Sequence, residues 1–115
     1  LRKLAAVVEE QRYRKNRNIF EQGGEPQALY IVREGQINLV AKRNGSEEVI
    51  AQVGEGAMFG GRALLDGATY TVTARSITLN TRVLAIPAPF LQPLLAELPH
   101  LKTRIADHSF DEEVV

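Results

Sequence analysis

The sequence predicts a mainly β domain, either an all-β sandwich or a small barrel, with helices at its two ends. Short apolar stretches alternate with glycine-bearing turns at spacings of about 8–12 residues, which is typical of these β folds. Asn44-Gly45 lies between two such stretches and indicates a hairpin, because a type I′ turn needs positive φ at both central residues. Apolar residues with helical spacing precede and follow this region, so we expect helices to flank the strands.

The first helix is predicted over residues 1–10, where the apolar residues share one helical face. These residues are Leu1, Leu4, Ala5 and Val8. The strand region is predicted over residues 11–88, and residues 59–67 interrupt it with a sequence that fits one helical turn. In chain order the strand candidates are Ile19-Phe20, Leu29 to Val32, Ile37 to Ala41, Val49 to Val53, Tyr70 to Ala74 and Thr81 to Ile86.

Proline ends the strand region at Pro87, since proline cannot donate a hydrogen bond to a neighbouring strand. Two helices are then predicted within residues 89–108, the first ending near Pro99. Their apolar stripes consist of Phe90, Leu91, Leu94, Leu95 and Leu98, then Leu101 and Ile105. Residues 109–115 are expected to form a tail.

The composition indicates one domain with an ordinary core. The chain has 115 residues, of which 44% are apolar and 24% charged. Fourteen basic residues balance fourteen acidic ones, so the domain lacks the overall positive field typical of nucleic-acid binding. The absence of cysteine excludes disulfides and thiolate metal sites within this chain. With no leader-like opening and no apolar run long enough to insert into a membrane, we expect a cytoplasmic domain.

Charge is concentrated at the two ends of the chain. Residues 1–17 hold six basic residues, including the run Arg12-Tyr13-Arg14-Lys15-x-Arg17, and residues 107–115 hold acidic residues without a base. These ends are either solvated or dock on the remainder of a longer polypeptide. The chain begins with Leu1 rather than methionine, which favours its being part of such a polypeptide.

Three spaced motifs occur together in the strand region. They are Ile19-Phe20-x-x-Gly23 before Leu29-Tyr30-Ile31-Val32; Gly35-x-Ile37-x-Leu39; and Val53-Gly54-Glu55-Gly56-x-x-Phe59-Gly60 before Ala63-Leu64-Leu65 and Thr71-Val72-x-Ala74. This ordered set resembles the cyclic-nucleotide-binding domain over about residues 4–106. The resemblance implies one domain over residues 1–115. Its fold would be an eight-stranded, jelly-roll-like double-stranded β-helix with an N-terminal helix, a one-turn helix and two C-terminal helices.

In that family a phosphate-binding cassette, here residues 59–74, cradles the cyclic phosphate and the ribose. Gly60 and Gly61 precede the helical turn, where glycine lets a ligand approach the backbone and N–H groups of the first turn hold an anion. The ligand-binding candidates are Phe59, Gly60, Gly61, Arg62, Ala63, Leu64, Ala68, Thr69, Tyr70 and Thr71.

The cassette departs from its relatives at both charged positions. The family's motif runs Phe-Gly-Glu, then a short helix, then Arg-x-Ala-Thr-Val-x-Ala, but Gly61 stands at the glutamate position and Ala68 at the arginine position. The intervening segment is also slightly shorter. Each lost charge-assisted hydrogen bond is worth roughly 1.5–3 kcal/mol, so two cost about 10²–10⁴ in affinity. We therefore expect weak or absent binding of cyclic AMP and cyclic GMP.

Other side chains offer alternatives that the sequence leaves open. Arg62 either meets a phosphate over the pocket or is a solvated arginine on an exposed turn. Arg75 is either a supporting base or an arginine that points outward. Thr69 and Tyr70 either contact a purine or are ordinary strand residues.

The sequence shows no residue pattern typical of an enzyme active site, so we expect a non-enzyme without a metal or cofactor. A cupin-like metal centre needs several histidines, but His100 and His108 both lie in the C-terminal helical region. Nothing resembles a nucleophile elbow. The chain also has no room for the helix-turn-helix that follows the barrel in catabolite activators, so we expect no nucleic-acid binding through this domain.

Relatives couple a ligand in the cassette to movement of the C-terminal helices, and the segment near Pro99 is a hinge candidate. Two hypotheses follow. Either the domain is a regulatory sensor of a small anionic ligand, held weakly through Arg62 and backbone amides, or it is a ligand-free structural or interaction domain within a larger transporter, regulator or shell protein. Homo-oligomerisation stays open.

Overall fold

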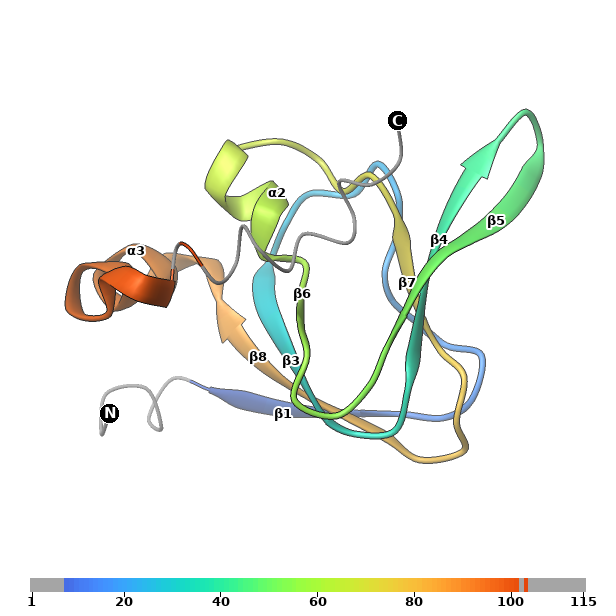
Figure 1. Ribbon diagram of the computed structural model, residues 1–115, viewed down its shortest axis with the longest axis horizontal. Coiled ribbons are helices and arrows are strands. Elements are labelled where there is room, and N and C mark those ends of the chain that lie inside the picture. The colour runs from blue at the N-terminus through green and yellow to red at the C-terminus, as the bar shows by residue number, and fades with distance from the viewer. Residues whose placement is uncertain (1–7, 102, 104–115) are drawn as a thin grey trace.

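The computed structural model describes residues 8–101 and 103, which form two antiparallel four-stranded sheets packed face to face (Figure 1). One sheet has the order β1-β8-β3-β6 and the other β2-β7-β4-β5. The predicted mainly β fold is therefore confirmed. The strands are β1 (Glu9–Tyr13), β2 (Asn18–Phe20), β3 (Ala28–Glu34), β4 (Ile37–Arg43), β5 (Ser46–Val53), β6 (Met58–Phe59), β7 (Thr73–Ser76) and β8 (Thr81–Pro87).

The core between the sheets follows from alternation along the strands. In β7, Ala74 is fully buried whereas Thr73 and Arg75 are only half-buried, because successive side chains point to opposite faces. Val83 and Ala85 alternate in the same way on β8. The other large inward side chains of this core include Val32, Ile37, Leu39 and Val72.

The predicted hairpin is confirmed at the tip of β4 and β5. Asn44 has φ of 52° and Gly45 has φ of 81°, the two positive values that a type I′ turn requires. The hairpin projects beyond the body of the two sheets (Figure 1).

The N-terminal helix predicted over residues 1–10 is wrong at its C-terminal end. Glu9 and Glu10 belong to β1, where they pair with Ala85 and Leu84 of β8. Backbone hydrogen bonds to the exposed edge of β8 decide this conformation, and a helical pattern does not reveal such a long-range partner. Residues 1–7 lie outside the described residues.

The strand predicted from Tyr70 to Ala74 begins only at Thr73. Tyr70 instead bonds to the turn after β2: its N–H donates to the carbonyl of Gly24 at 3.0 Å, and its carbonyl accepts from the N–H of Gly23 at 2.8 Å. The segment is therefore a loop held against that turn.

Two helices cover one end of the sandwich, namely α2 (Gly61–Asp66) and α3 (Ala88–Glu97). The one-turn helix predicted inside the strand region is thus confirmed as α2. Leu91 of α3 is buried in a second apolar cluster with Leu29, Met58 and Ile86, against which leucines of α2 also pack. Residues 99–101 are helical, as predicted for a second C-terminal helix, whereas the predicted tail 109–115 lies outside the described residues. No helix that the structure describes has the length and apolar character needed to cross a membrane.

Candidate functional site

The cassette borders a hollow of about 230 Å³ beside α2. Its walls come from α2, from the loop after it, and from the turn that follows β2. The lining residues are Glu25, Pro26, Ala63, Leu64, Gly67, Ala68 and Thr69. The structure thus brings together four of the predicted candidates, namely Ala63, Leu64, Ala68 and Thr69.

Among residues 8–101 and 103, none of the side chains that line this hollow is basic. The one charged group among these side chains is the carboxylate of Glu25, which is exposed. A carboxylate repels an anion, so the charge at this hollow disfavours a phosphate. Sequence reasoning missed Glu25 and Pro26. They lie far from the cassette along the chain, and the preceding glycines signalled only a turn.

Gly60 is needed here for protein packing. It adopts φ of 79° immediately before α2. A Cβ atom at this position would lie 3.0 Å from Cε2 of Phe20 and 3.3 Å from Cδ2 of Tyr30. The side of Gly60 on which a Cβ atom would lie is therefore filled by aromatic rings, and contact between a ligand and the Gly60 backbone stays a prediction. Gly61 is buried as the first residue of α2.

Four aromatic side chains fill the interior next to the cassette, and two of them, Phe59 and Tyr70, were candidates for ligand contact. The ring of Tyr70 stacks on Phe20 with centroids 3.7 Å apart, and Tyr30 stacks on Phe59 at 5.3 Å. The Tyr70 hydroxyl accepts a hydrogen bond of 3.4 Å from the backbone N–H of Gln27. Burial raises the pKa of Tyr30 well above its ordinary value. This cluster belongs to the packed core between the sheets.

Tyr70 is also a departure from the family motif. Where the motif has an alanine two residues after its arginine, this chain has Tyr70, whose ring is 2% exposed. The structure shows that this ring points inward and is buried against Phe20.

Arg62 and Thr71 do not line the hollow. Nε of Arg62 lies 3.0 Å from Oδ2 of Asp66, one turn further along α2. Thr71 is exposed in the loop before β7.

Arg75 is held on the outer face of its sheet. Its two terminal nitrogens bond to the two carboxylate oxygens of Glu47 at 2.9 and 3.0 Å, and its Nε donates to Oδ1 of Asn18 at 3.0 Å. These hydrogen bonds lower the pKa of Glu47. The outward arrangement of Arg75 is therefore the one that the structure contains.

Within residues 8–101 and 103, no three His, Cys, Asp or Glu side chains gather as metal ligands would. His100 belongs to this part of the chain, whereas His108 lies outside it.

Comparison with known proteins identifies the family. Residues 10–97 match the cyclic nucleotide-binding domain, so the chain belongs to that family, as the motifs indicated. The chain is 32% identical over 95 residues to the cyclic AMP receptor protein of Thermus thermophilus, a match that covers 82% of this chain and 44% of that protein. It is 33% identical over 93 residues to the lysophospholipase NTE1 of Chaetomium globosum, covering 76% of this chain and 6% of the enzyme.

Solved structures agree with this assignment. The catabolite activator protein of Thermus thermophilus superposes with a TM-score of 0.82 at 28% identity, covering 92% of this chain and 50% of that one. The chain spans less than half the length of the curated relatives it matches. The jelly-roll-like sandwich with flanking helices is therefore the fold of the family.

Proposed function

We propose that this domain is a regulatory module of the cyclic-nucleotide-binding family that binds cyclic AMP and cyclic GMP weakly or not at all. The observation that carries the proposal is the hollow beside α2, whose lining, among the residues that the structure describes, has no basic group and one carboxylate, that of Glu25. A cyclic phosphate placed there would lose its hydration and gain no charged partner from the lining.

The interior packing supports the same conclusion. Tyr70 places a buried ring where the family motif has alanine, and Phe20 and Tyr30 crowd Gly60 from the other side. A ligand that needed this space would have to displace a stacked aromatic pair, which costs about 0.5–1.5 kcal/mol beyond the lost burial.

The route from the cassette to the C-terminal helix is intact. Leu64 and Leu65 of α2 pack on the same apolar cluster as Leu91 and Leu94 of α3. A shift of α2 would therefore be transmitted to α3 through this apolar cluster, whatever molecule causes the shift. The proposed domain therefore keeps a regulatory role, but cyclic AMP and cyclic GMP are not its effectors.

Two functions are compatible with weak or absent binding of cyclic AMP and cyclic GMP, and they differ in whether the domain binds any small anion. One is a sensor that holds a weak anionic ligand through the backbone amides of α2, which supply only about 0.3–1 kcal/mol at an exposed helix terminus. The other is a ligand-free interaction domain, which the Glu25 carboxylate at the hollow and the filled interior favour. We infer for both that the domain regulates or binds and catalyses nothing itself.

Isothermal titration calorimetry with cyclic AMP, cyclic GMP and a cyclic dinucleotide tests the proposal directly. We expect no dissociation constant below about 0.1 mM for the cyclic mononucleotides, since two missing charged contacts weaken a micromolar site by about 10²–10⁴. A constant below about 10 µM for either mononucleotide would overturn the proposal.

Restoring the motif tests the alignment on which the proposal rests. Gly61→Glu with Ala68→Arg should strengthen cyclic AMP binding by about 10²–10⁴ if these positions face the ligand. The matched control exchanges the two charges, as Gly61→Arg with Ala68→Glu, and should bind no better than the unchanged chain. If the first variant fails, adding Tyr70→Ala restores the small residue of the motif. No gain in either variant would mean that the cassette is misplaced.

A further inference from the structure

A group of basic side chains lies in the turn between β1 and β2, far from the cassette along the chain. We call residues 12–17 the basic turn; its charged members are Arg12, Arg14, Lys15 and Arg17, all exposed. Arg12 lies 3.4 Å from a carboxylate oxygen of Glu10. Within the described part of the chain, no acidic side chain comes within 4.0 Å of the other three bases.

A buried serine fixes the shape of the basic turn. Ser76 on β7 is fully buried; its hydroxyl donates to the carbonyl of Arg14 and accepts from the N–H of Arg17 at 3.0 Å. The backbone of Ser76 also bonds to the turn, accepting from Asn16 at 2.8 Å and donating to Arg17 at 2.9 Å. Asn16 adopts φ of 64°, which allows the turn to close. The basic side chains are therefore presented on a backbone that needs little further ordering on binding.

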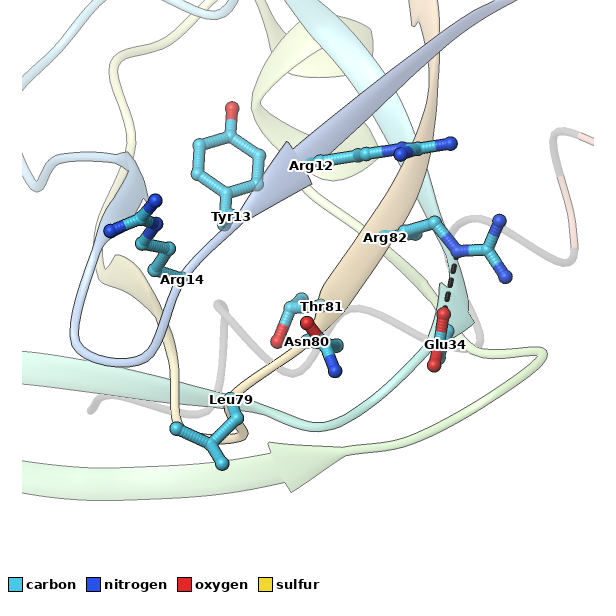
Figure 2. Close-up of a pocket in the computed structure, with 8 residues that line it drawn as sticks. All are labelled: Arg12, Tyr13, Arg14, Glu34, Leu79, Asn80, Thr81 and Arg82. Carbon is cyan, nitrogen blue, oxygen red and sulfur yellow. Dashed lines mark hydrogen bonds and ion pairs between the residues drawn. The ribbon is translucent and has the colours of Figure 1, made fainter.

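The basic turn separates two open hollows of about 440 and 540 Å³, which share Arg12, Tyr13 and Arg14. Figure 2 shows the first hollow. Arg12 and Arg82 are register partners on β1 and β8, and their side chains extend in the same direction there. Leu79 lies at the same hollow and is 77% exposed. The surface therefore combines arginines, a half-buried tyrosine and one exposed leucine.

We propose that the basic turn and its two hollows dock an acidic, leucine-bearing segment of a partner protein. The planar guanidinium of arginine matches a carboxylate with two parallel hydrogen bonds. Arginine and tyrosine are also the residue types that dominate binding energy at protein–protein interfaces. Leu79 supplies an apolar contact beside Arg14 and Arg82, so an acidic segment that also carries an apolar side chain fits better than a purely acidic one.

The distribution of charge favours a peptide over a polynucleotide or a membrane. Glu34 and Glu21 line the two hollows, and Glu34 bonds to Arg82 at 2.6 Å. These carboxylates interrupt the positive surface, so a continuous phosphate backbone would meet repulsion at intervals. A peptide can space its carboxylates to avoid these positions. The formal net charge of zero also provides no long-range attraction to nucleic acid or to an anionic bilayer.

Fluorescence anisotropy on the 115-residue chain tests this docking surface with three probes. They are a labelled peptide of alternating glutamate and leucine, a labelled single-stranded DNA, and vesicles containing phosphatidylserine. The test variant is Arg14→Glu with Lys15→Glu. The matched control is Lys42→Glu with Arg43→Glu, which makes the same change of net charge near the tip of the β4–β5 hairpin.

We expect the peptide to bind the unchanged chain and to lose at least about tenfold in affinity with the test variant, since reversal replaces several attractions by repulsions. The control should change affinity less than about threefold. Thermal melting shows whether each variant is folded, and a peptide with glutamine in place of glutamate should bind weakly. Equal loss in both variants, tighter binding of DNA or vesicles than of the peptide, or no peptide binding would each overturn the proposal.

Discussion

The cassette hollow and the basic turn differ in charge. The positive charge that the family's anionic ligand would require in the cassette lies instead at the basic turn. The family binds an anion in the cassette, yet here the described residues that line the hollow include no base and one carboxylate, that of Glu25. In the same described part of the chain, three bases of the basic turn have no acidic side chain within 4.0 Å, yet the family motif gives that turn no role. The comparison shows that the fold can keep its shape while the charges that decide what it binds are placed elsewhere.

The two regions also differ in what holds them. The cassette side is held by aromatic packing around Tyr70 and Phe20, which is apolar and insensitive to salt. The basic turn is held by hydrogen bonds to the buried hydroxyl and to the backbone of Ser76. Variants that remove each support should therefore affect the two regions separately.

Removing the buried ring of Tyr70 should have the largest effect. Tyr70→Ala deletes a side chain that is 2% exposed and should lower the free energy of unfolding by about 3–5 kcal/mol. Urea unfolding measures this change. Tyr70→Phe keeps the ring and loses only the 3.4 Å hydrogen bond to Gln27, so it should cost less than about 1.5 kcal/mol. Equal costs for the two variants would mean that stacking does not support the cassette.

Crowding at the start of α2 should have the next largest effect. Gly60→Ala places a Cβ atom 3.0 Å from the ring of Phe20 at a positive φ, and should destabilise the fold by about 2–4 kcal/mol. Gly45→Ala is the matched control, because Gly45 also has positive φ but has open space around it. It should cost only the backbone strain, about 1–2 kcal/mol. Chemical denaturation of both variants compares the two costs.

Loosening the basic turn should have a smaller effect on the whole fold. Ser76→Ala removes the hydroxyl that bonds to Arg14 and Arg17, and should cost about 1–3 kcal/mol because buried backbone groups lose a partner. In the Ser76→Ala variant, hydrogen exchange at the N–H of Arg17 should become faster than in the unchanged chain. The N–H groups of the β4–β5 hairpin should be affected less. If Arg17 keeps its full protection, the turn does not depend on Ser76.

Within the described residues, Arg75, unlike three bases of the basic turn, is paired with a carboxylate, that of Glu47. Removing this ion pair should have the smallest effect of the four changes. Arg75 lowers the pKa of Glu47 below its ordinary value of 4.5. The pair therefore stabilises the fold above that pH, and its contribution is lost as the pH falls through the lowered value. Glu47→Gln should remove this part of the pH dependence of the melting temperature, whereas Glu48→Gln should leave it. Both carboxylates are exposed, so the difference should be small and should shrink in salt.

Features that neighbouring residues encode could be predicted without knowledge of the fold. Asn44-Gly45 fixed the hairpin because only certain residues adopt its φ values, and the interruption at residues 59–67 located α2. The absence of the family's charged residues at Gly61 and Ala68 could also be read from the chain alone. These signals are local, so they survive without knowledge of the fold.

Contacts between segments that are distant in the sequence could not be predicted in this way. The tertiary structure placed Glu25 at the cassette hollow, paired Glu9 with Ala85 rather than continuing a helix, and buried Ser76 beneath the basic turn. In each case the partners lie tens of residues apart in the sequence. Their contact depends on how the sheets pack and which edge remains open for hydrogen bonding, and a periodic pattern within one segment carries no information about a distant partner.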